Sequence, residues 1–226
     1  MKYLIPALTI VALLIKVGCN CVGGCCIGNC KPVIYLYPTE EVEVTVELDY
    51  EGTLDFIYPD FDPELDAWHI EAHPDGTLIN IADGKEYPYL FWEGTPAECP
   101  DYDLTTGFVV AGEKTVELLE QILGQMGLIP KEYNEFIVYW GPRMKINPYN
   151  FIHFAGAELD EIAKLTITPE PDSILRINMI FSPLNKRIEV TPQEITPFER
   201  EGFTVVEWGG VEINYWTYPS LLKNVS

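Results

Sequence analysis

Basic residues are scarce in this sequence of 226 residues. Lysine and arginine together number 14, against 35 aspartate and glutamate residues, and the formal net charge is −21 at pH 7. The stretch 32–84 contains 14 acidic residues and no lysine or arginine. Such a surface repels phosphate backbones, so we expect no nucleic-acid partner. An acidic surface of this kind suits divalent cations, a cationic partner or solubility at high salt.

Several catalytic signatures are also missing. The sequence contains no G-x-S-x-G nucleophile elbow and no phosphate-cradling glycine loop. No C-x-x-C pair occurs, which disfavours a structural zinc site. Beyond residue 30, Cys99 is the only cysteine that could act as a thiol nucleophile. Motifs alone therefore assign no reaction to the chain.

The first 18 residues have the pattern of a signal peptide. Lys2 is followed by a mostly apolar run at 3–15, which is shorter than the roughly 20 residues that span a bilayer. A V-G-C motif ending at Cys19 resembles the end of a bacterial lipoprotein signal, although Lys16 stands where that pattern has an apolar residue. We therefore expect export to the cell envelope or beyond it, with Cys19 as a candidate lipidation site and membrane anchor.

Residues 19–30 form a tether rich in cysteine and glycine. Oxidising conditions outside the cell favour disulfides, and the glycines let the backbone fold back on itself. A thiolate cluster that binds zinc or copper(I) is the rival interpretation, and a disulfide-stiffened or flexible tether is the preferred one. The candidate disulfide partners are Cys21, Cys25, Cys26, Cys30 and Cys99.

The body at 31–210 is predicted to be one strand-dominated α+β domain, followed by a C-terminal segment at 211–226. Alternating apolar and polar residues predict an antiparallel sheet or sandwich in its first half. The expected strands are 33–37, 41–49, 54–58, 67–72, 77–81 and 86–92. Turn sequences separate the last three, which predicts a meander.

The second half reads as a mixed segment with one main helix. Residues 95–106 are a candidate internal boundary. Apolar residues at helical spacing predict the main helix over 113–126, which Gly127 is placed to cap, and a short helix is expected over 159–164. Further strands are expected at 107–111, 136–140, 149–154, 174–181 and 203–208.

Five phrases together resemble a family of uncharacterised, mostly secreted bacterial and fungal proteins. They are KPVIYLYP at 31–38, PDGTL at 74–78, YLFWEG at 89–94, NEFIVYW at 134–140 and GFTVVEWGG at 202–210. The resemblance covers nearly the whole body and leaves the cysteine tether outside it. It implies secretion and supplies no catalytic residue.

Glu93 and Glu207 are candidate catalytic carboxylates. Each ends an apolar row of a predicted strand, beside Trp92 or Trp208 and just before a glycine. Apolar surroundings raise the pKa of a carboxyl group, as a general acid requires, and a neighbouring tryptophan suits a sugar ring. If the strand ends converge, the pair could serve a glycoside hydrolase. The alternative is that each glutamate binds a backbone amide or a base such as Arg143.

An acidic loop is a candidate calcium site. An EF-hand loop takes its calcium ligands from positions 1, 3, 5, 7 and 12. Acidic residues occur here at the same spacing: Asp60, Asp62, Glu64, Asp66 and Glu71. Leu65 replaces the turn glycine, Pro63 restricts the loop and strands flank it. The segment is therefore either a calcium-binding loop of another type or a solvated acidic loop. No cofactor other than calcium is expected.

His69, Glu71 and His73 share one face of a predicted strand. Imidazole and carboxylate groups can together hold zinc. The spacing along the strand stretches the ligand distances, and His73 belongs to a turn. A solvent-facing strand with two ordinary histidines is the preferred interpretation.

Residues 139–145 bring aromatic and basic side chains together. Arg143 and Lys145 are rare cations in an acidic chain, and they follow Trp140 across a Gly-Pro step. They could hold an anionic sugar or a carboxylate ligand, and the alternative is that they neutralise local acids.

The leading hypothesis is therefore an exported or envelope-anchored, non-catalytic domain that binds a glycan or another surface component. Two alternatives stay open. One is a carbohydrate-active hydrolase that uses the paired carboxylates, and the other is a structural surface subunit joined through disulfides.

Overall fold

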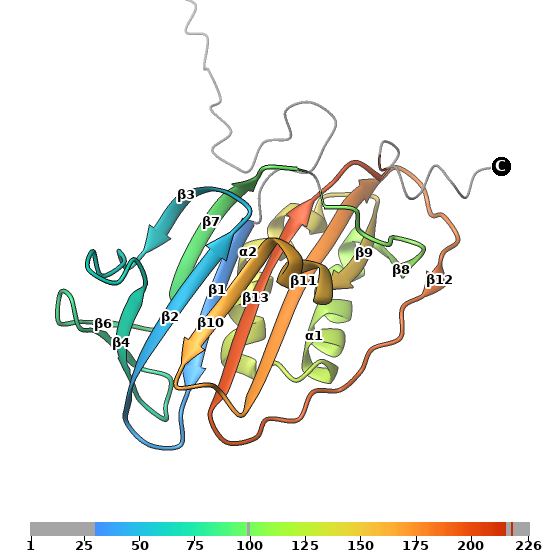
Figure 1. Cartoon of the computed structure of the whole chain (residues 1–226). Helices are drawn as coiled ribbons and strands as arrows, with labels where there is room; N and C mark the ends of the chain where they lie inside the picture. Colours follow the sequence, from blue (N-terminus) through green and yellow to red (C-terminus); the bar gives the residue numbers. More distant parts are fainter. Residues whose placement is uncertain (1–29, 99, 216–217, 219–226) are drawn as a thin grey trace, which may run out of the picture.

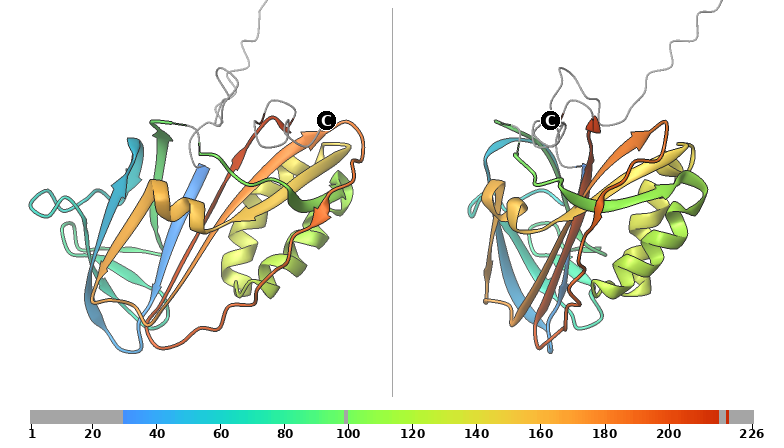
Figure 2. Two further views of the ribbon diagram at one scale, coloured as in Figure 1. Left: turned by 45° about the vertical axis from the view of Figure 1, so that its right-hand side comes forward. Right: turned by 90° about the vertical axis from the view of Figure 1, so that its right-hand side faces the viewer.

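A computed structural model describes residues 30–98, 100–215 and 218 (Figure 1). The predicted signal peptide, the lipidation site at Cys19 and the disulfide candidates Cys21, Cys25, Cys26 and Cys99 lie outside these residues. The described part has three layers, in which one sheet covers a second sheet and two helices cover the other side of that second sheet (Figure 2). The predicted strand-dominated α+β fold is confirmed.

The central layer is an eight-stranded sheet, which we call sheet A. Its order is β12 (Thr191–Pro192), β8 (Thr106–Ala111), β9 (Tyr149–Ala155), β11 (Ser173–Leu184), β13 (Thr204–Glu212), β1 (Cys30–Tyr37), β7 (Leu90–Pro96) and β3 (Gly52–Tyr58). Strand β13 runs antiparallel to β1 and parallel to β11.

The outer sheet, sheet B, has five strands. Its order is β10 (Ala163–Thr168), β2 (Val42–Tyr50), β4 (Trp68–Ala72), β5 (Leu78–Asn80) and β6 (Lys85–Tyr87). Strands from both sides of residues 95–106 take part in each sheet, because β1 pairs with β13 in sheet A and β2 pairs with β10 in sheet B.

Strand β1 lies between two hydrophobic cores. Its side chains alternate, so that Val33 and Tyr35 pack under the helices whereas Ile34 and Leu36 pack toward sheet B. All four are fully buried. Because both faces of β1 are buried, nearly every residue of this segment is apolar.

The helix layer contains two helices, of which the sequence pattern predicts the first and not the second. Helix α1 (Thr115–Gln125) follows a 3-10 turn, η1 (Gly112–Lys114), and confirms the predicted helix. Gly127 after it has a φ of 102°, a conformation that favours glycine. None of the helices in the described part of the chain has both the length and the apolar character that a membrane span requires.

Residues 136–140, predicted as a strand, belong instead to helix α2 (Pro130–Lys145). Pro130 occupies the first helical position, and the Glu132 side chain accepts a hydrogen bond from the Ile129 N–H at 2.9 Å. Phe136, Trp140 and Met144 recur every four residues and are buried, which is a helical period. The short window F-I-V-Y-W hides this period because every residue in it favours strands.

Residues 86–92, predicted as one strand, are divided between β6 in sheet B and β7 in sheet A. Pro88 lies at the division, and it has no N–H to donate to a strand ladder. The expected strands 149–154, 174–181 and 203–208 correspond to β9, β11 and β13. The short helix is α3 (Ala157–Ile162).

Candidate functional site

The two long helices cover only part of the outer side of sheet A. In Figure 1, α1 and α2 lie behind β9, β11 and β13, whereas no described helix lies behind β3 and β7. Four aromatic residues lie on this side of the sheet, and we call them the aromatic face: Phe56, Tyr58, Tyr89 and Phe91. Tyr89 and Phe91 are partly buried against the core under the helices, whereas Phe56 and Tyr58 are exposed.

Phe56 and Tyr58 are the most exposed members of the aromatic face. Their side chains are 54% and 52% exposed, and their rings stack with centroids 6.5 Å apart. The β3–β7 register places Tyr58 opposite Phe91, and the Phe91 ring lies edge-on to Phe56 with centroids 5.8 Å apart. Contiguous exposed aromatic surface of this kind marks an interaction site more often than an isolated apolar residue does.

A row of polar groups lies beside the aromatic face, and we call it the polar border. Its members are Lys31, Glu93, Glu135, Tyr139 and Arg143. The last three recur every four residues along α2 and so lie on one side of the helix. The Tyr35 hydroxyl donates a hydrogen bond to Glu135 Oε2 at 3.2 Å, which ties this side of α2 to β1.

Lys31 and Arg143 both contact the ring of Tyr139. Lys31 Nζ lies 5.2 Å from the centre of that ring and 5.3 Å from the ring of Trp208, and Arg143 Cζ lies 4.0 Å from the Tyr139 ring centre. Both arrangements are cation–π contacts. In the described part of the chain, neither cation has a carboxylate within 4.0 Å.

The surroundings of Lys31 and Glu93 disfavour their charged forms. Burial lowers the pKa of Lys31, while Glu135 acts to raise it and Arg143 to lower it further. Burial raises the pKa of Glu93, although the backbone N–H of Lys31, 3.4 Å from Glu93 Oε1, acts in the opposite direction. Shifted ionisable groups beside an exposed aromatic surface make this area the best candidate site in the described residues.

Glu207 has entirely different surroundings. Its side chain is fully buried, Oε1 accepts a hydrogen bond from Trp92 Nε1 at 2.9 Å, and Oε2 lies 2.5 Å from Arg176 Nε. Arg176 stands opposite Glu207 in the β11–β13 register, and its Nη1 also contacts Asp160 of α3 at 2.5 Å. Both carboxylate oxygens of Glu207 are therefore used inside the protein.

The structure does not bring Glu93 and Glu207 together as a catalytic pair. Trp92 reaches Glu207, so these two side chains share the side of sheet A that faces sheet B. Glu93 follows Trp92 in β7 and points to the opposite side, because successive side chains of a strand alternate. The paired-carboxylate arrangement is therefore wrong. Glu207 does bind a base, but the base is Arg176 and not Arg143.

The tryptophans predicted to bind a sugar belong to the cores. Trp92, Trp140 and Trp208 are at most 1% exposed. Of the predicted binding residues, Arg143 alone is exposed, and it lies in the polar border. Sequence reasoning missed Phe56 and Tyr58, because alternation shows that they share a face but not that this face lacks a covering helix.

The calcium and zinc sites predicted between Asp60 and His73 do not form in the described residues. The Asp62 carboxylate accepts the Glu64 N–H at 2.9 Å within its own loop, and His69 lies near Glu43 and Asp62 while His73 lies near Glu41 and Glu71. Within residues 30–98, 100–215 and 218, no group of three histidine, cysteine or acidic side chains is placed to hold a metal ion. This leaves the calcium prediction (Asp60, Asp62, Glu64, Asp66, Glu71) and the zinc prediction (His69, Glu71, His73) without support.

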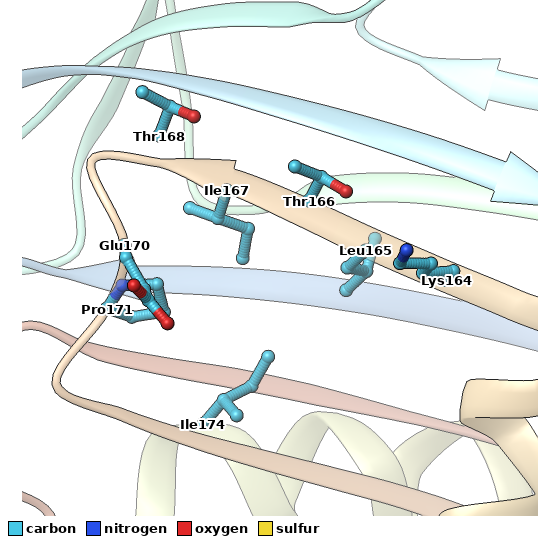
Figure 3. Close-up of a pocket in the computed structure, with 8 residues that line it drawn as sticks. All are labelled: Lys164, Leu165, Thr166, Ile167, Thr168, Glu170, Pro171 and Ile174. Atoms are coloured by element: carbon cyan, nitrogen blue, oxygen red, sulfur yellow. The ribbon is translucent and has the colours of Figure 1, made fainter.

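A groove of about 680 Å³ lies beside β10, the edge strand of sheet B, and we call it the β10 groove. In Figure 3, Leu165 and Ile167 point toward Ile174 of β11, and Thr166 and Thr168 point the other way. Lys164 and Glu170 are the charged residues of its lining, which is otherwise made of leucine, isoleucine, threonine and proline. Its lining contains none of the aromatic rings that mark the first site.

Comparison with known proteins yields a relative whose name states no activity. A segment of 65 residues is 46% identical to the "Uncharacterized protein in bglA 3'region" of Butyrivibrio fibrisolvens. The segment is 28% of this chain and 65% of the relative, so the match spans just under two thirds of the relative's length. No family model matches the sequence, and no solved structure matches it.

Proposed function

We propose that the protein is a non-catalytic binding domain whose aromatic face holds a glycan. The observation that carries this proposal is the stacked pair of Phe56 and Tyr58, two rings more than half exposed on a strand that no described helix covers. A pyranose ring has a flat face of C–H groups and a rim of hydroxyls. Two stacked rings offer a matching apolar platform, and burying them under a ligand removes apolar area from water.

The polar border supports the same function. Glu93, Tyr139 and Arg143 place a carboxylate, a phenol and a guanidinium beside the platform, and sugar hydroxyls can both donate to and accept from such groups. A few polar groups beside an apolar contact surface are the usual means of fixing a ligand's orientation. The predicted export leader agrees with a ligand outside the cell, and we propose the cell surface or envelope as the location.

The hydrolase alternative has less support. A glycosidase needs two carboxyl groups on the two sides of one scissile bond, and Glu93 and Glu207 point to opposite sides of sheet A. The disulfide-linked subunit remains a prediction, because every candidate cysteine except Cys30 lies outside the described residues.

The proposal is tested by glycan binding of the full chain and of two variants, Phe56→Ala and Tyr58→Ala. Affinity electrophoresis against cellulose derivatives, xylan, mixed-linkage glucan, chitin fragments and polygalacturonate covers neutral and acidic glycans. We expect at least one glycan to retard the wild type, and each variant to lose about tenfold in affinity, which corresponds to about 1.4 kcal/mol.

Ile146→Ala is the matched control, because Ile146 is a highly exposed apolar residue just after α2 and outside the aromatic face. Its binding should equal that of the wild type. Retardation of the wild type by none of these glycans would refute the proposal, and so would wild-type affinity in both aromatic variants.

A further inference from the structure

Lys31 differs from the other lysines and arginines of the described residues. It is the only one that is partly buried and also lacks a carboxylate within 4.0 Å. The other partly buried cations, Arg176 and Arg200, are both ion-paired. In a chain with 35 acidic residues and 14 basic ones, a half-buried cation without an acidic partner requires an explanation.

The conformation of Lys31 is unfavourable as well. Its φ is 54°, in the left-handed region that residues with a Cβ rarely adopt, and it lies at a register shift where β1 bulges against β13. Burial of its ammonium group adds a second cost, although Glu135 and the Tyr139 and Trp208 rings favour the charge. Backbone strain and desolvation at one residue are typical of functional positions.

Arg143 places a second positive charge on the ring of Tyr139. Its guanidinium stacks on the Tyr139 ring that Lys31 also contacts, and its charge acts to lower the pKa of Lys31. Like charges on one ring repel each other, and an anion that contacts both would reduce the repulsion.

The carboxylates of the polar border are engaged elsewhere. Glu135 accepts the Tyr35 hydroxyl, and Glu93 accepts the Lys31 backbone N–H. Neither lies within 4.0 Å of the Lys31 ammonium or the Arg143 guanidinium. Arg143 Nη1 donates a hydrogen bond to the Tyr139 carbonyl at 2.5 Å. The other guanidinium nitrogens and the Lys31 ammonium are left to contact a ligand.

We infer that the ligand is a glycan that carries carboxylate groups, with Lys31 and Arg143 binding a uronate carboxylate while Phe56 and Tyr58 stack against a sugar ring. This inference rests on the proposed function. Arginine matches a carboxylate with two parallel hydrogen bonds. A uronate, with one charge per sugar, suits this site better than a densely sulfated chain does, because the net charge of −21 and the nearby Glu93 and Glu135 oppose a high density of negative charge.

The test compares polygalacturonate with its fully methyl-esterified form, which keeps the sugar backbone and masks each carboxylate. We expect the full chain to bind the free acid about tenfold more tightly than the ester. Lys31→Met and Arg143→Gln should each abolish this preference. Lys145→Gln is the matched control, since Lys145 is an exposed cation at the same end of α2, and it should keep the preference.

Thermal unfolding separates binding from folding. Lys31→Met should melt at or above the wild-type temperature, because it removes a desolvated charge. Equal binding of acid and ester by a wild type that binds both would overturn the inference and leave the proposed function intact. Wild-type preference in both Lys31→Met and Arg143→Gln would also overturn it, as would equally tight binding of dextran sulfate. Binding to no glycan at all would instead refute the proposed function.

Discussion

Glu93 and Glu207 have similar sequence surroundings and opposite structural roles. Each follows a tryptophan or precedes one, each comes shortly before a glycine, and both lie in sheet A. Glu207 points into the core between the sheets, where Trp92 and Arg176 use both of its oxygens. Glu93 points to the other side, half-buried beside the aromatic face. The role of each carboxylate follows from which layer covers its side of the sheet.

The strongest test of this difference is the pair Glu207→Gln and Glu93→Gln. Glu207→Gln leaves the buried Arg176 with only the exposed Asp160 as an acidic partner, so we expect a loss of about 3–5 kcal/mol in unfolding free energy. Glu93→Gln should leave it unchanged or raise it at neutral pH, because the substitution removes a charge that burial disfavours. Urea denaturation of the full chain measures both.

The double variant Arg176→Met, Glu207→Leu serves as the control for that experiment. Replacing both charges with apolar groups removes the unpaired charge, and it should recover most of the lost stability. A loss below about 1 kcal/mol in Glu207→Gln would show that the buried pair is not the constraint we describe.

A smaller effect distinguishes two buried tryptophans. Trp92 Nε1 donates to the Glu207 carboxylate, whereas Trp68 Nε1 donates to the Pro59 carbonyl at 2.8 Å. Hydrogen bonds to charged groups contribute about 1.5–3 kcal/mol and neutral ones about 0.5–1.5 kcal/mol. Trp92→Phe should therefore destabilise the protein more than Trp68→Phe in the same denaturation assay. The reverse order would contradict a charged Glu207.

The smallest effect concerns the pH dependence of stability. Because burial raises the pKa of Glu93 above 4.5, the folded state holds this proton more tightly than the unfolded state. Stability then decreases as pH rises from 4.5 through the raised pKa. Glu93→Gln should reduce that slope in unfolding experiments between about pH 4 and pH 7. An unchanged slope in Glu93→Gln would contradict the shift.

The strands were the most predictable part of the fold. The period-two pattern of β2 and the apolar runs of β11 and β13 can be read directly from the residues. Helix α2 was not predicted, because its strand-favouring residues at 136–140 outweigh, in a short window, the four-residue spacing of Phe136, Trp140 and Met144. In the folded protein these three side chains pack against sheet A, and this tertiary contact stabilises the segment as a helix.

The candidate site was much less predictable than the strands. Arg143 could be singled out because cations are rare in this chain. Phe56, Tyr58 and Lys31 could not, because their significance depends on where the helices end across sheet A and on a bulge in β1. These are long-range features, and periodicity along one segment contains no information about them.

The most direct test of the central claim is an NMR titration of the full chain with a glycan that retards it in electrophoresis. If the aromatic face is the binding surface, the largest chemical-shift changes will fall on Phe56, Tyr58 and Phe91 and on the α2 side of the polar border. Resonances of Glu207 and of the β10 groove will stay in place. Shift changes centred on Leu165 and Ile167 of the β10 groove, with β3 and β7 unaffected, would contradict the account.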